Sequence, residues 1–248
     1  MVVPSSLARM TSIEAWRKAT AVHLLEERRL GLISVWHPSF LTLLLEYMER
    51  HRAELTALLS PKRAKEISAL GPGLPWEEVW PALRLVSCWT DAGAKEFVPS
   101  LRQCFPNVCI QGKGLLATEG VVSIPIRGQV GCALAVNGHF LEFVDLQEEG
   151  KSPLPAHRLR IGGEYSPLLT TLGGLYRYAL KDVVRCVGKW MGVPLVRFEG
   201  KLDGTSDLCG EKMTVLQAEK ALAFAREKTG LDIRFAMLSP QIGRASCR

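Results

Sequence analysis

The spacing of apolar and polar positions predicts helices in the first third of the chain. Residues 12–29 mix apolar and charged positions at helical spacing, and residues 61–70 have the pattern of a second, shorter helix. Between them, the run that starts at Ile33 predicts a strand, a break at Pro38 and then a helix that Ser39 caps. The chain therefore begins with helices and at least one strand.

A parallel sheet is predicted from the next segment. The stretch Leu83–Trp89, LRLVSCW, has the β-branched and aromatic content of a buried strand. Residues 91–105 then have a helical pattern that starts at Asp91 or Ala92, and a second strand follows as far as Ile110. A strand, a helix and a strand in this order form a βαβ unit, which implies parallel strands.

Short strands joined by tight turns are predicted after Glu119. The stretches VVSIPI, GCALAV and HFLEFVDL have strand patterns, and Asn137-Gly138 is a strong hairpin signal. The strand pattern continues to about Gly200, and residues 210–230 predict an amphipathic helix. Its apolar positions, which fit a face packed on another element, are Val215, Leu216, Ala218, Leu222 and Phe224. The whole pattern predicts an α/β fold with a boundary near residue 200.

The composition is that of a globular protein. Of the 248 residues, 47% are hydrophobic and 23% are charged, which predicts a packed core. The net charge of +6 is spread over interleaved basic and acidic residues, so we expect no nucleic-acid partner, whereas a polyanionic small molecule is compatible with it. The seven cysteines lack zinc-type spacing, and no apolar window has the length of a signal peptide or a membrane span. A reducing cytoplasm is the simplest interpretation.

Thr118 and Glu119 are the most specific candidate site. A hydroxyl donates to a phosphate oxygen, and a neighbouring carboxylate suits Mg²⁺, which takes one or two carboxylates together with substrate phosphates. The glycines Gly112, Gly114 and Gly120 would let the backbone approach such a ligand closely. Polar dipeptides are common in turns, so a capped turn is the simpler alternative.

Other segments carry further candidate residues. Asp182 lies where a turn meets a buried strand, from which a carboxylate can take both hydroxyls of a ribose, although an ordinary turn Asp is equally compatible. Tyr176 and Tyr178 share one strand face and suit either packing or a ligand platform. The segment 200–213 is either a linker or a hinge that turns at Asp203-Gly204.

Several familiar chemistries lack support in this sequence. It contains no Walker-type phosphate loop, no GxGxxG after a strand and no GxSxG elbow. The five histidines show no metal-binding spacing, and nothing points to a Ser-His-Asp triad.

Four stretches, taken in order, resemble the Gretchen Hagen three family of acyl-acid amido synthetases, also called auxin-responsive promoter proteins. They are LISVWHPSFLTLLLE, WPALRLVSCWTDAGAKEFVPSLRQCFPNVCIQGKGLLATEGVVSIP, GLYRYALKDVVRCVG and FEGKLDGTSDLCGEK. That family belongs to the adenylate-forming superfamily of acyl-CoA synthetases and luciferases. The resemblance covers most of residues 12–240.

The resemblance implies an enzyme that uses ATP and Mg²⁺ to convert a carboxylic acid into an acyl-adenylate. An amine, often an amino acid, would then attack the adenylate to give an amide and AMP. The implied catalytic pair is Thr118 at the α-phosphate and Glu119 at Mg²⁺. The other implied nucleotide-binding residues are Gly114, Tyr178, Asp182 (at the ribose) and Lys201, and the implied hinge residues are Asp203 and Gly204.

The chain departs from the family pattern at several positions. The family's YRYRxGD is YRYALKD here, so Ala179 and Lys181 replace an arginine and a glycine. Leu115 stands where the superfamily often places an aromatic ring that stacks on adenine. No Ser/Thr/Gly-rich phosphate loop precedes residue 110.

These departures suggest the middle of a longer protein. We expect residues 1–199 to be part of the large adenylation domain and residues 200–240 to be the hinge and a truncated C-terminal domain. Residues 241–248, QIGRASCR, have neither strand nor helix pattern and match the translation of a common sequencing adapter, so we expect them to be read-through.

Three hypotheses about function follow. In the first, the parent protein is an adenylate-forming ligase and this chain is an inactive fragment of it. In the second, the chain is a genuine short protein that binds a nucleotide or an acyl ligand without catalysis. In the third, it is an interaction module that uses the helix at residues 211–228. The sequence identifies neither the acid nor the acceptor, and it does not give the oligomeric state.

Overall fold

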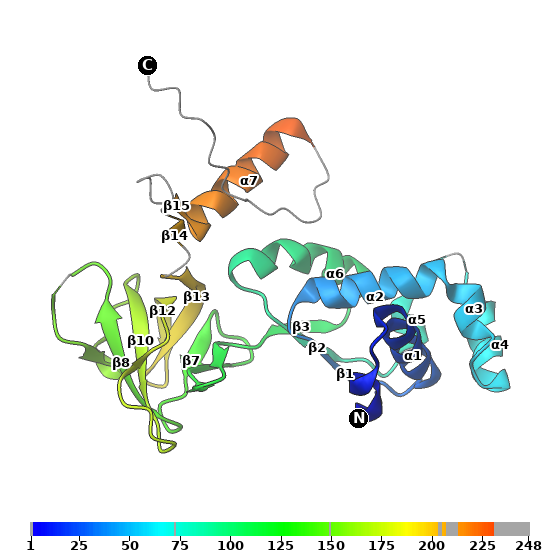
Figure 1. Ribbon diagram of the computed structural model, residues 1–248, viewed down its shortest axis with the longest axis horizontal. Coiled ribbons are helices and arrows are strands. Elements are labelled where there is room, and N and C mark those ends of the chain that lie inside the picture. Colours follow the sequence, from blue (N-terminus) through cyan, green and yellow to red (C-terminus); the bar gives the residue numbers. More distant parts are fainter. Residues whose placement is uncertain (1, 72, 149, 203–204, 207–212, 231–248) are drawn as a thin grey trace. The chain divides into compact units, whose positions relative to one another are not determined.

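The computed structural model describes residues 2–71, 73–148, 150–202, 205–206 and 213–230. The chain forms two compact units, residues 1–113 and residues 114–248 (Figure 1). The first contains a parallel sheet and the second an antiparallel sheet, so the chain is a mixed α/β protein as predicted. The predicted boundary near residue 200 lies within the second unit and stays a prediction.

The first unit combines short helices with a three-stranded parallel sheet (Figure 1). The strands are β1 (Leu32–Ser34), β2 (Leu85–Cys88) and β3 (Cys109–Gly112), in the order β1-β2-β3. The α-helices are α1 (Ile13–Glu26), α2 (Pro38–Arg50), α3 (Arg52–Thr56), α4 (Pro61–Ala69), α5 (Trp76–Val79) and α6 (Val98–Cys104). Two 3-10 helices, η1 (Ser5–Arg9) and η2 (Ala92–Phe97), complete it. Because β2 and β3 are parallel and joined through α6, the predicted βαβ unit is confirmed.

Local capping explains where the first helices begin. Ser12 precedes α1, and its hydroxyl accepts a hydrogen bond from the backbone N–H of Ala15 at 3.3 Å. The prediction for α2 was wrong in detail: Pro38 is the first residue of the helix, and His37 caps it through Nδ1, which accepts from the N–H of Ser39 at 3.3 Å. Proline suits this position because the first turn of a helix needs no backbone donor there.

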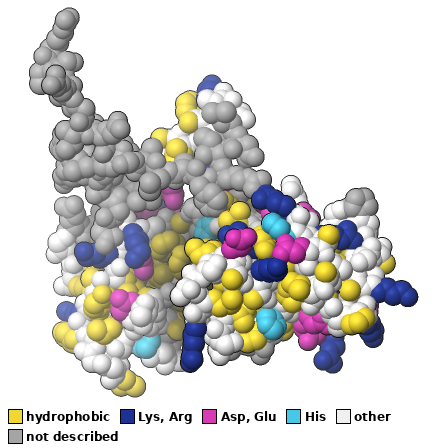
Figure 2. Space-filling view, turned by 45° about the vertical axis from the view of Figure 1, so that its right-hand side comes forward, with side chains coloured by type: hydrophobic (Ala, Val, Ile, Leu, Met, Phe, Trp, Pro, Cys, Tyr) yellow, Lys and Arg dark blue, Asp and Glu magenta, His cyan; other side chains and the backbone are white. Residues whose placement is uncertain are grey.

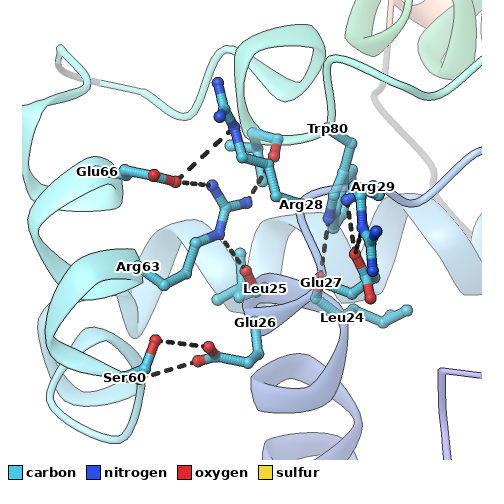
Figure 3. Close-up of polar contacts among 11 residues, drawn as sticks. Leu24, Leu25, Glu26, Glu27, Arg28, Arg29, Ser60, Arg63, Glu66 and Trp80 are labelled. Atoms are coloured by element: carbon cyan, nitrogen blue, oxygen red, sulfur yellow. Dashed lines mark hydrogen bonds and ion pairs between the residues drawn. The ribbon is translucent and has the colours of Figure 1, made fainter.

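Arg63 of α4 is buried and connects three helices of the first unit (Figure 3). Its Nε donates to the carbonyl of Leu25 at 2.6 Å, and its terminal nitrogens donate to the carbonyl of Val79 at 2.5 Å and to Glu66 at 3.0 Å. The indole N–H of Trp80 donates at 2.9 Å to the carbonyl of the residue before Leu25. The last carbonyls of a helix have no partner within it, so these two side chains satisfy the end of α1.

The second unit is built on a larger antiparallel sheet (Figure 1). The order is β6-β7-β13-β12-β10-β8-β9, and β11 pairs with β10. The bounds are β6 (Ser123–Pro125), β7 (Cys132–Leu134), β8 (Phe140–Asp145), β9 (Leu154–Pro155), β10 (Glu164–Thr170), β11 (Tyr178–Ala179), β12 (Asp182–Trp190) and β13 (Val193–Lys201). A separate pair is formed by β4 (Leu116–Ala117) and β5 (Gly120–Val121), and η3 (Ala156–Arg158) follows β9. The short strands predicted after Glu119 are confirmed.

The hairpin predicted at Asn137-Gly138 is not formed. These residues do lie in a turn, between β7 and β8, but the two strands are not paired with each other. β7 pairs with β6 and β13, whereas β8 pairs with β10 and β9. An Asn-Gly dipeptide favours a tight turn locally, but which strands then pair is decided by contacts far apart in the sequence.

The end of the described chain contains the predicted helix. It is α7 (Val215–Thr229), which follows the short pair β14 (Thr205–Ser206) and β15 (Met213–Thr214). Ala218 and Leu222 are half-buried, but Phe224 is 60% exposed. The helix is therefore confirmed, whereas the predicted packing of Phe224 is not. The side chains of residues 215 and 216 lie outside what the structure describes.

The surface of the described residues carries both signs of charge. On the face shown in Figure 2, Lys and Arg side chains lie among Asp and Glu side chains. This agrees with the interleaved charges of the sequence. None of the helices in the described ranges combines the length and apolar character that crossing a membrane requires.

Candidate functional site

Thr118 and Glu119 are the two central residues of a β-hairpin in the second unit. They connect β4 to β5, whose partners are Leu116 with Val121 and Ala117 with Gly120. Thr118 is exposed and Glu119 is half-buried. The hairpin therefore presents a hydroxyl and a carboxylate next to each other at its tip.

Tyr178 of β11 interacts with the carboxylate of Glu119. Hydrogen bonding of the phenol with Glu119 and the negative charge of that carboxylate raise the pKa of Tyr178 above its ordinary value. The positive charge of Lys201 acts in the opposite direction and is a smaller effect. Sequence patterns alone did not predict this contact, because β4–β5 and β11 are almost sixty residues apart.

Asp182 and Lys201 form an ion pair close to this contact. They are register partners, at the start of β12 and the end of β13, and Lys201 Nζ lies 3.3 Å from Asp182 Oδ1. The side chain of Asp182 is 6% exposed and that of Lys201 is 59% exposed. Since Lys201 also acts electrostatically on Tyr178, the structure brings together four of the predicted site residues, Glu119, Tyr178, Asp182 and Lys201.

An arginine anchors the segment that carries Tyr178. Arg177 donates to both carboxylate oxygens of Glu142, at 2.8 and 2.7 Å, and the side chain of Glu142 is only 9% exposed. The bidentate hydrogen bond to Glu142 and the negative charge of that carboxylate together raise the pKa of Arg177. Our sequence reasoning missed this pair. Its signal was a glutamate inside the apolar run FLEFV, since a buried carboxylate requires a partner.

The backbone before Asp182 adopts an unusual conformation. Lys181 has a φ of 58°, in the left-handed region that glycine adopts without strain. The family pattern has a glycine at this position, so the structure gives a physical reason for that glycine. Ala179, the other departure, is exposed and pairs with Leu168 in the β10–β11 ladder.

The three glycines near the hairpin contact protein atoms. A Cβ at Gly114 would lie 2.4 Å from the carbonyl oxygen of Ser123, and one at Gly120 would lie 2.6 Å from Nε2 of His139. A Cβ at Gly112, in the first unit, would lie 2.6 Å from the hydroxyl of Thr90. At Gly114 the neighbour is backbone and φ is 75°, so the protein itself requires glycine there, whereas at Gly112 and Gly120 a neighbouring side chain would have to move. The proposed role of Gly114 in binding therefore stays a prediction.

The remaining predicted residues give less information. Leu115, at the position of the superfamily's aromatic ring, is half-buried and packs against the core of the second unit. Asp203 and Gly204, the predicted hinge, lie outside the described residues, as do residues 241–248.

Comparisons with known proteins agree with the resemblance seen in the sequence. Residues 132–201 match the model of the "GH3 family central domain". The GH3 domain-containing protein of Mus musculus is 31% identical over 177 residues, which are 67% of this chain and 33% of that protein. A probable indole-3-acetic acid-amido synthetase of Oryza sativa subsp. japonica, GH3.7, is 24% identical over 189 residues, 66% of this chain and 30% of that protein.

The fold of the chain is also similar to that of a solved structure of this family. The solved structure of the GH3.15 acyl acid amido synthetase matches 92% of this chain and 46% of its own chain, with a TM-score of 0.72 and 18% identity. The chain thus spans about a third of the length of the curated relatives it matches. We conclude that this protein is a homologue of the GH3 family acyl acid amido synthetases and corresponds to part of their length.

Proposed function

We propose that this chain carries part of the nucleotide site of an ATP-dependent acid-amido synthetase. The observation that supports this most strongly is the convergence of Glu119, Tyr178, Asp182 and Lys201. These residues come from a hairpin tip, a short edge strand and the ends of two paired strands, and they form one connected polar group. The family resemblance assigns Glu119 to Mg²⁺ and Asp182 to the ribose, and it places Tyr178 and Lys201 among the nucleotide-binding residues.

Each residue has a role suited to its surroundings. Thr118 is exposed at the hairpin tip and would donate to an oxygen of the α-phosphate. Asp182 would accept hydrogen bonds from the ribose hydroxyls, because an ionised carboxylate is a hydrogen-bond acceptor with two oxygens. Lys201 has an exposed ammonium group that would offset phosphate charge.

The donor set around Glu119 fits Mg²⁺. Mg²⁺ keeps several waters and usually takes one or two protein carboxylates in addition to substrate phosphates. Glu119 offers one carboxylate at a half-exposed turn, and its bond from Tyr178 leaves other lone pairs for a metal. When bound, the ion would offset negative charge that develops on the phosphates.

The proposed reaction is activation of a carboxylic acid followed by transfer to an amine or amino acid. The carboxylate of the acid attacks the α-phosphorus of ATP and pyrophosphate leaves, and the amine then attacks the acyl carbon and AMP leaves. Within this scheme, the described residues hold and orient the nucleotide and offset its charge. Because the chain covers about a third of its relatives, we expect the isolated chain to lack turnover.

Carboxylate-dependent exchange of pyrophosphate into ATP tests this proposal in a longer protein that contains the chain. A panel of aromatic and aliphatic acids should include at least one that supports exchange. Glu119→Gln should abolish it, because the amide is a much weaker Mg²⁺ ligand. Glu148→Gln is the matched control, since Glu148 belongs to a separate ion pair with Lys151 and should leave exchange unchanged. If no acid supports exchange, the ligase proposal fails.

The alternative function is nucleotide or acyl-ligand binding without catalysis. Titration of the isolated chain with ATP and Mg²⁺ addresses it. Binding that Asp182→Asn weakens, together with a longer protein that shows no exchange, would favour the alternative over the ligase.

A further inference from the structure

The short strand that carries Tyr178 is held only weakly by backbone pairing. β11 has two residues, and its pairing with β10 consists of Leu168 with Ala179 and Leu169 with Tyr178. The loop that precedes β11 is exposed at Tyr176, whose exposed fraction is 78%. A segment with so few buried contacts opens at a low free-energy cost, so side-chain contacts should decide where Tyr178 lies.

Arg177 provides such contacts immediately before β11. Its φ of 46° lies in the left-handed region, and a residue other than glycine keeps this conformation only where its surroundings impose it. Its backbone N–H donates to the hydroxyl of Thr170 at 3.1 Å, and its guanidinium group donates to both carboxylate oxygens of Glu142 at 2.8 and 2.7 Å. Bidentate pairs of this kind fix orientation as well as distance. Arg177 therefore ties the start of β11 to β10 and to β8.

The contact with Glu142 and the contact with the hairpin lie on opposite faces of the sheet. Within the ladders of β10, Glu142 is opposite Leu168 and Tyr178 is opposite Leu169. Consecutive residues of a strand point to opposite faces, so Glu142 and Tyr178 lie on different sides of β10. The β4–β5 hairpin is on the side of Tyr178, since a Cβ at Gly120 would lie 3.1 Å from the side chain of Leu169. The two contacts therefore hold β11 from both faces.

We infer that the ion pair of Arg177 with Glu142 is a positioning device, which fixes β11 so that Tyr178 meets the hairpin tip. The partner of Tyr178 there is the carboxylate of Glu119. A hydrogen-bonding partner of this kind orients a carboxylate for a metal ion. The consequence for Mg²⁺ rests on the proposed function, whereas the positioning of Tyr178 does not. Arg177 thus acts on the site through Tyr178, from the opposite face of the sheet.

Nuclear magnetic resonance of the full chain labelled with ¹³C-tyrosine tests the positioning. The chain has four tyrosines, and the ring signals of Tyr178 are assigned by their loss in Tyr178→Phe. Glu119→Gln removes the charge beside the ring and should shift these signals when Arg177 is present. In an Arg177→Met background the same Glu119→Gln change should cause little or no shift, because the ring no longer lies against the hairpin. An equal shift in both backgrounds would overturn the inference.

Arg160→Met is the matched control for Arg177→Met. Arg160 also pairs with a buried carboxylate of β8, that of Asp145, at 2.8 Å, and the Asp145 side chain is 3% exposed. Its loss should destabilise the unit in a similar way but leave the response of Tyr178 to Glu119→Gln intact. If Arg160→Met also removes the response, general destabilisation explains the result and the inference fails.

Arg177→Lys keeps the charge and loses the bidentate geometry, so it carries the same test if Arg177→Met does not fold. We expect a reduced response of the Tyr178 ring to Glu119→Gln in this background. A full response in Arg177→Lys would contradict the inference.

The effect on the metal is measured in the longer protein. Arg177→Met should raise the Mg²⁺ concentration that gives half-maximal pyrophosphate exchange by about tenfold or more, with a smaller change in the rate at saturating Mg²⁺. Arg160→Met should leave this concentration unchanged. An unchanged Mg²⁺ requirement in Arg177→Met would overturn the link from the ion pair to the metal. A longer protein without any exchange would count against the ligase proposal alone, because the ring signals of Tyr178 test the positioning without a nucleotide.

Discussion

Replacing Arg63 with methionine should destabilise the first unit strongly. Arg63 is 5% exposed, and its guanidinium group donates to the carbonyl oxygens of Leu25 and Val79 and to the carboxylate of Glu66 (Figure 3). Methionine preserves most of the apolar volume of the side chain and donates none of these hydrogen bonds. The substitution therefore tests the polar contacts rather than packing.

The size of the expected loss in unfolding free energy follows from the groups that lose their hydrogen bonds to Arg63. A hydrogen bond that involves a charged group contributes about 1.5–3 kcal/mol, and an unpaired buried acceptor costs about 1–3 kcal/mol. Two carbonyls lose their partner, and the effects overlap because one side chain makes both contacts. We therefore expect a loss of about 3–5 kcal/mol, a large part of the 5–15 kcal/mol that is typical for a domain.

Tryptophan fluorescence during urea unfolding measures this loss selectively. Five of the six tryptophans, Trp16, Trp36, Trp76, Trp80 and Trp89, belong to the first unit, so the signal reports mainly on its unfolding. The midpoint for Arg63→Met should fall well below that of the wild type.

Arg28→Met is the matched control for this experiment. The Arg28 side chain is 60% exposed and lies 3.8 Å from Glu66, so its loss should cost less than about 0.5 kcal/mol. If Arg63→Met loses no more stability than Arg28→Met, the argument that Arg63 satisfies the helix end is refuted.

Three further predictions concern the second unit. Lys181→Gly should stabilise it by roughly 0.5–1 kcal/mol in thermal unfolding, because relief of left-handed strain exceeds the added flexibility of glycine; destabilisation would contradict this. Glu119→Gln should lower the pKa of Tyr178. In an alkaline titration, tyrosinate absorbance should then appear at a lower pH, after the titration curve of Tyr178→Phe has been subtracted to isolate the signal of Tyr178. Because folding raises this pKa, its stabilising contribution is complete below the ordinary tyrosine pKa and is lost as the pH rises through the raised value. Arg177→Met should lower the unfolding midpoint by leaving the buried carboxylate of Glu142 unpaired, and adding Glu142→Gln should restore part of the loss.

Local signals in the sequence predicted the helices and the parallel strands well. The helix predicted within residues 12–29 and the βαβ unit depend on residues close together in the chain, and both are confirmed. The start of α2 was missed because His37 and Ser39 both flank Pro38 and both can accept a backbone hydrogen bond. Which of them does so depends on backbone angles that the residue types do not specify.

Local signals in the sequence did not predict which distant strands pair with each other. Asn137-Gly138 favours a turn, yet β7 and β8 join different neighbours because each finds an apolar partner elsewhere in the sheet. The same limit applies to the candidate site. Residue types and the family resemblance indicated Glu119, Tyr178, Asp182 and Lys201, but neither the Tyr178–Glu119 bond nor the Asp182–Lys201 pair was anticipated.

The glycines show a different limit. A glycine-rich loop suggests close approach of a ligand, but the same residue is required where the protein itself is close. At Gly114 and Gly120 the nearest atoms belong to Ser123 and His139, which are residues of the protein itself. The glycines therefore correctly indicated that other atoms lie close to the backbone, but they did not show whether those atoms belong to a ligand or to the protein.

The departure at Lys181 connects the sequence pattern to the geometry of the site. A glycine in the family pattern and a φ of 58° here point independently to a left-handed residue directly before Asp182. Such a residue turns the chain sharply, after which β12 begins with Asp182 opposite Lys201. Lysine at this position costs some stability but keeps the turn, and the ion pair at the strand ends is formed nonetheless. The replacement therefore changes the strain in the site rather than the arrangement of its residues, which is why we expect Lys181→Gly to raise stability without moving Asp182.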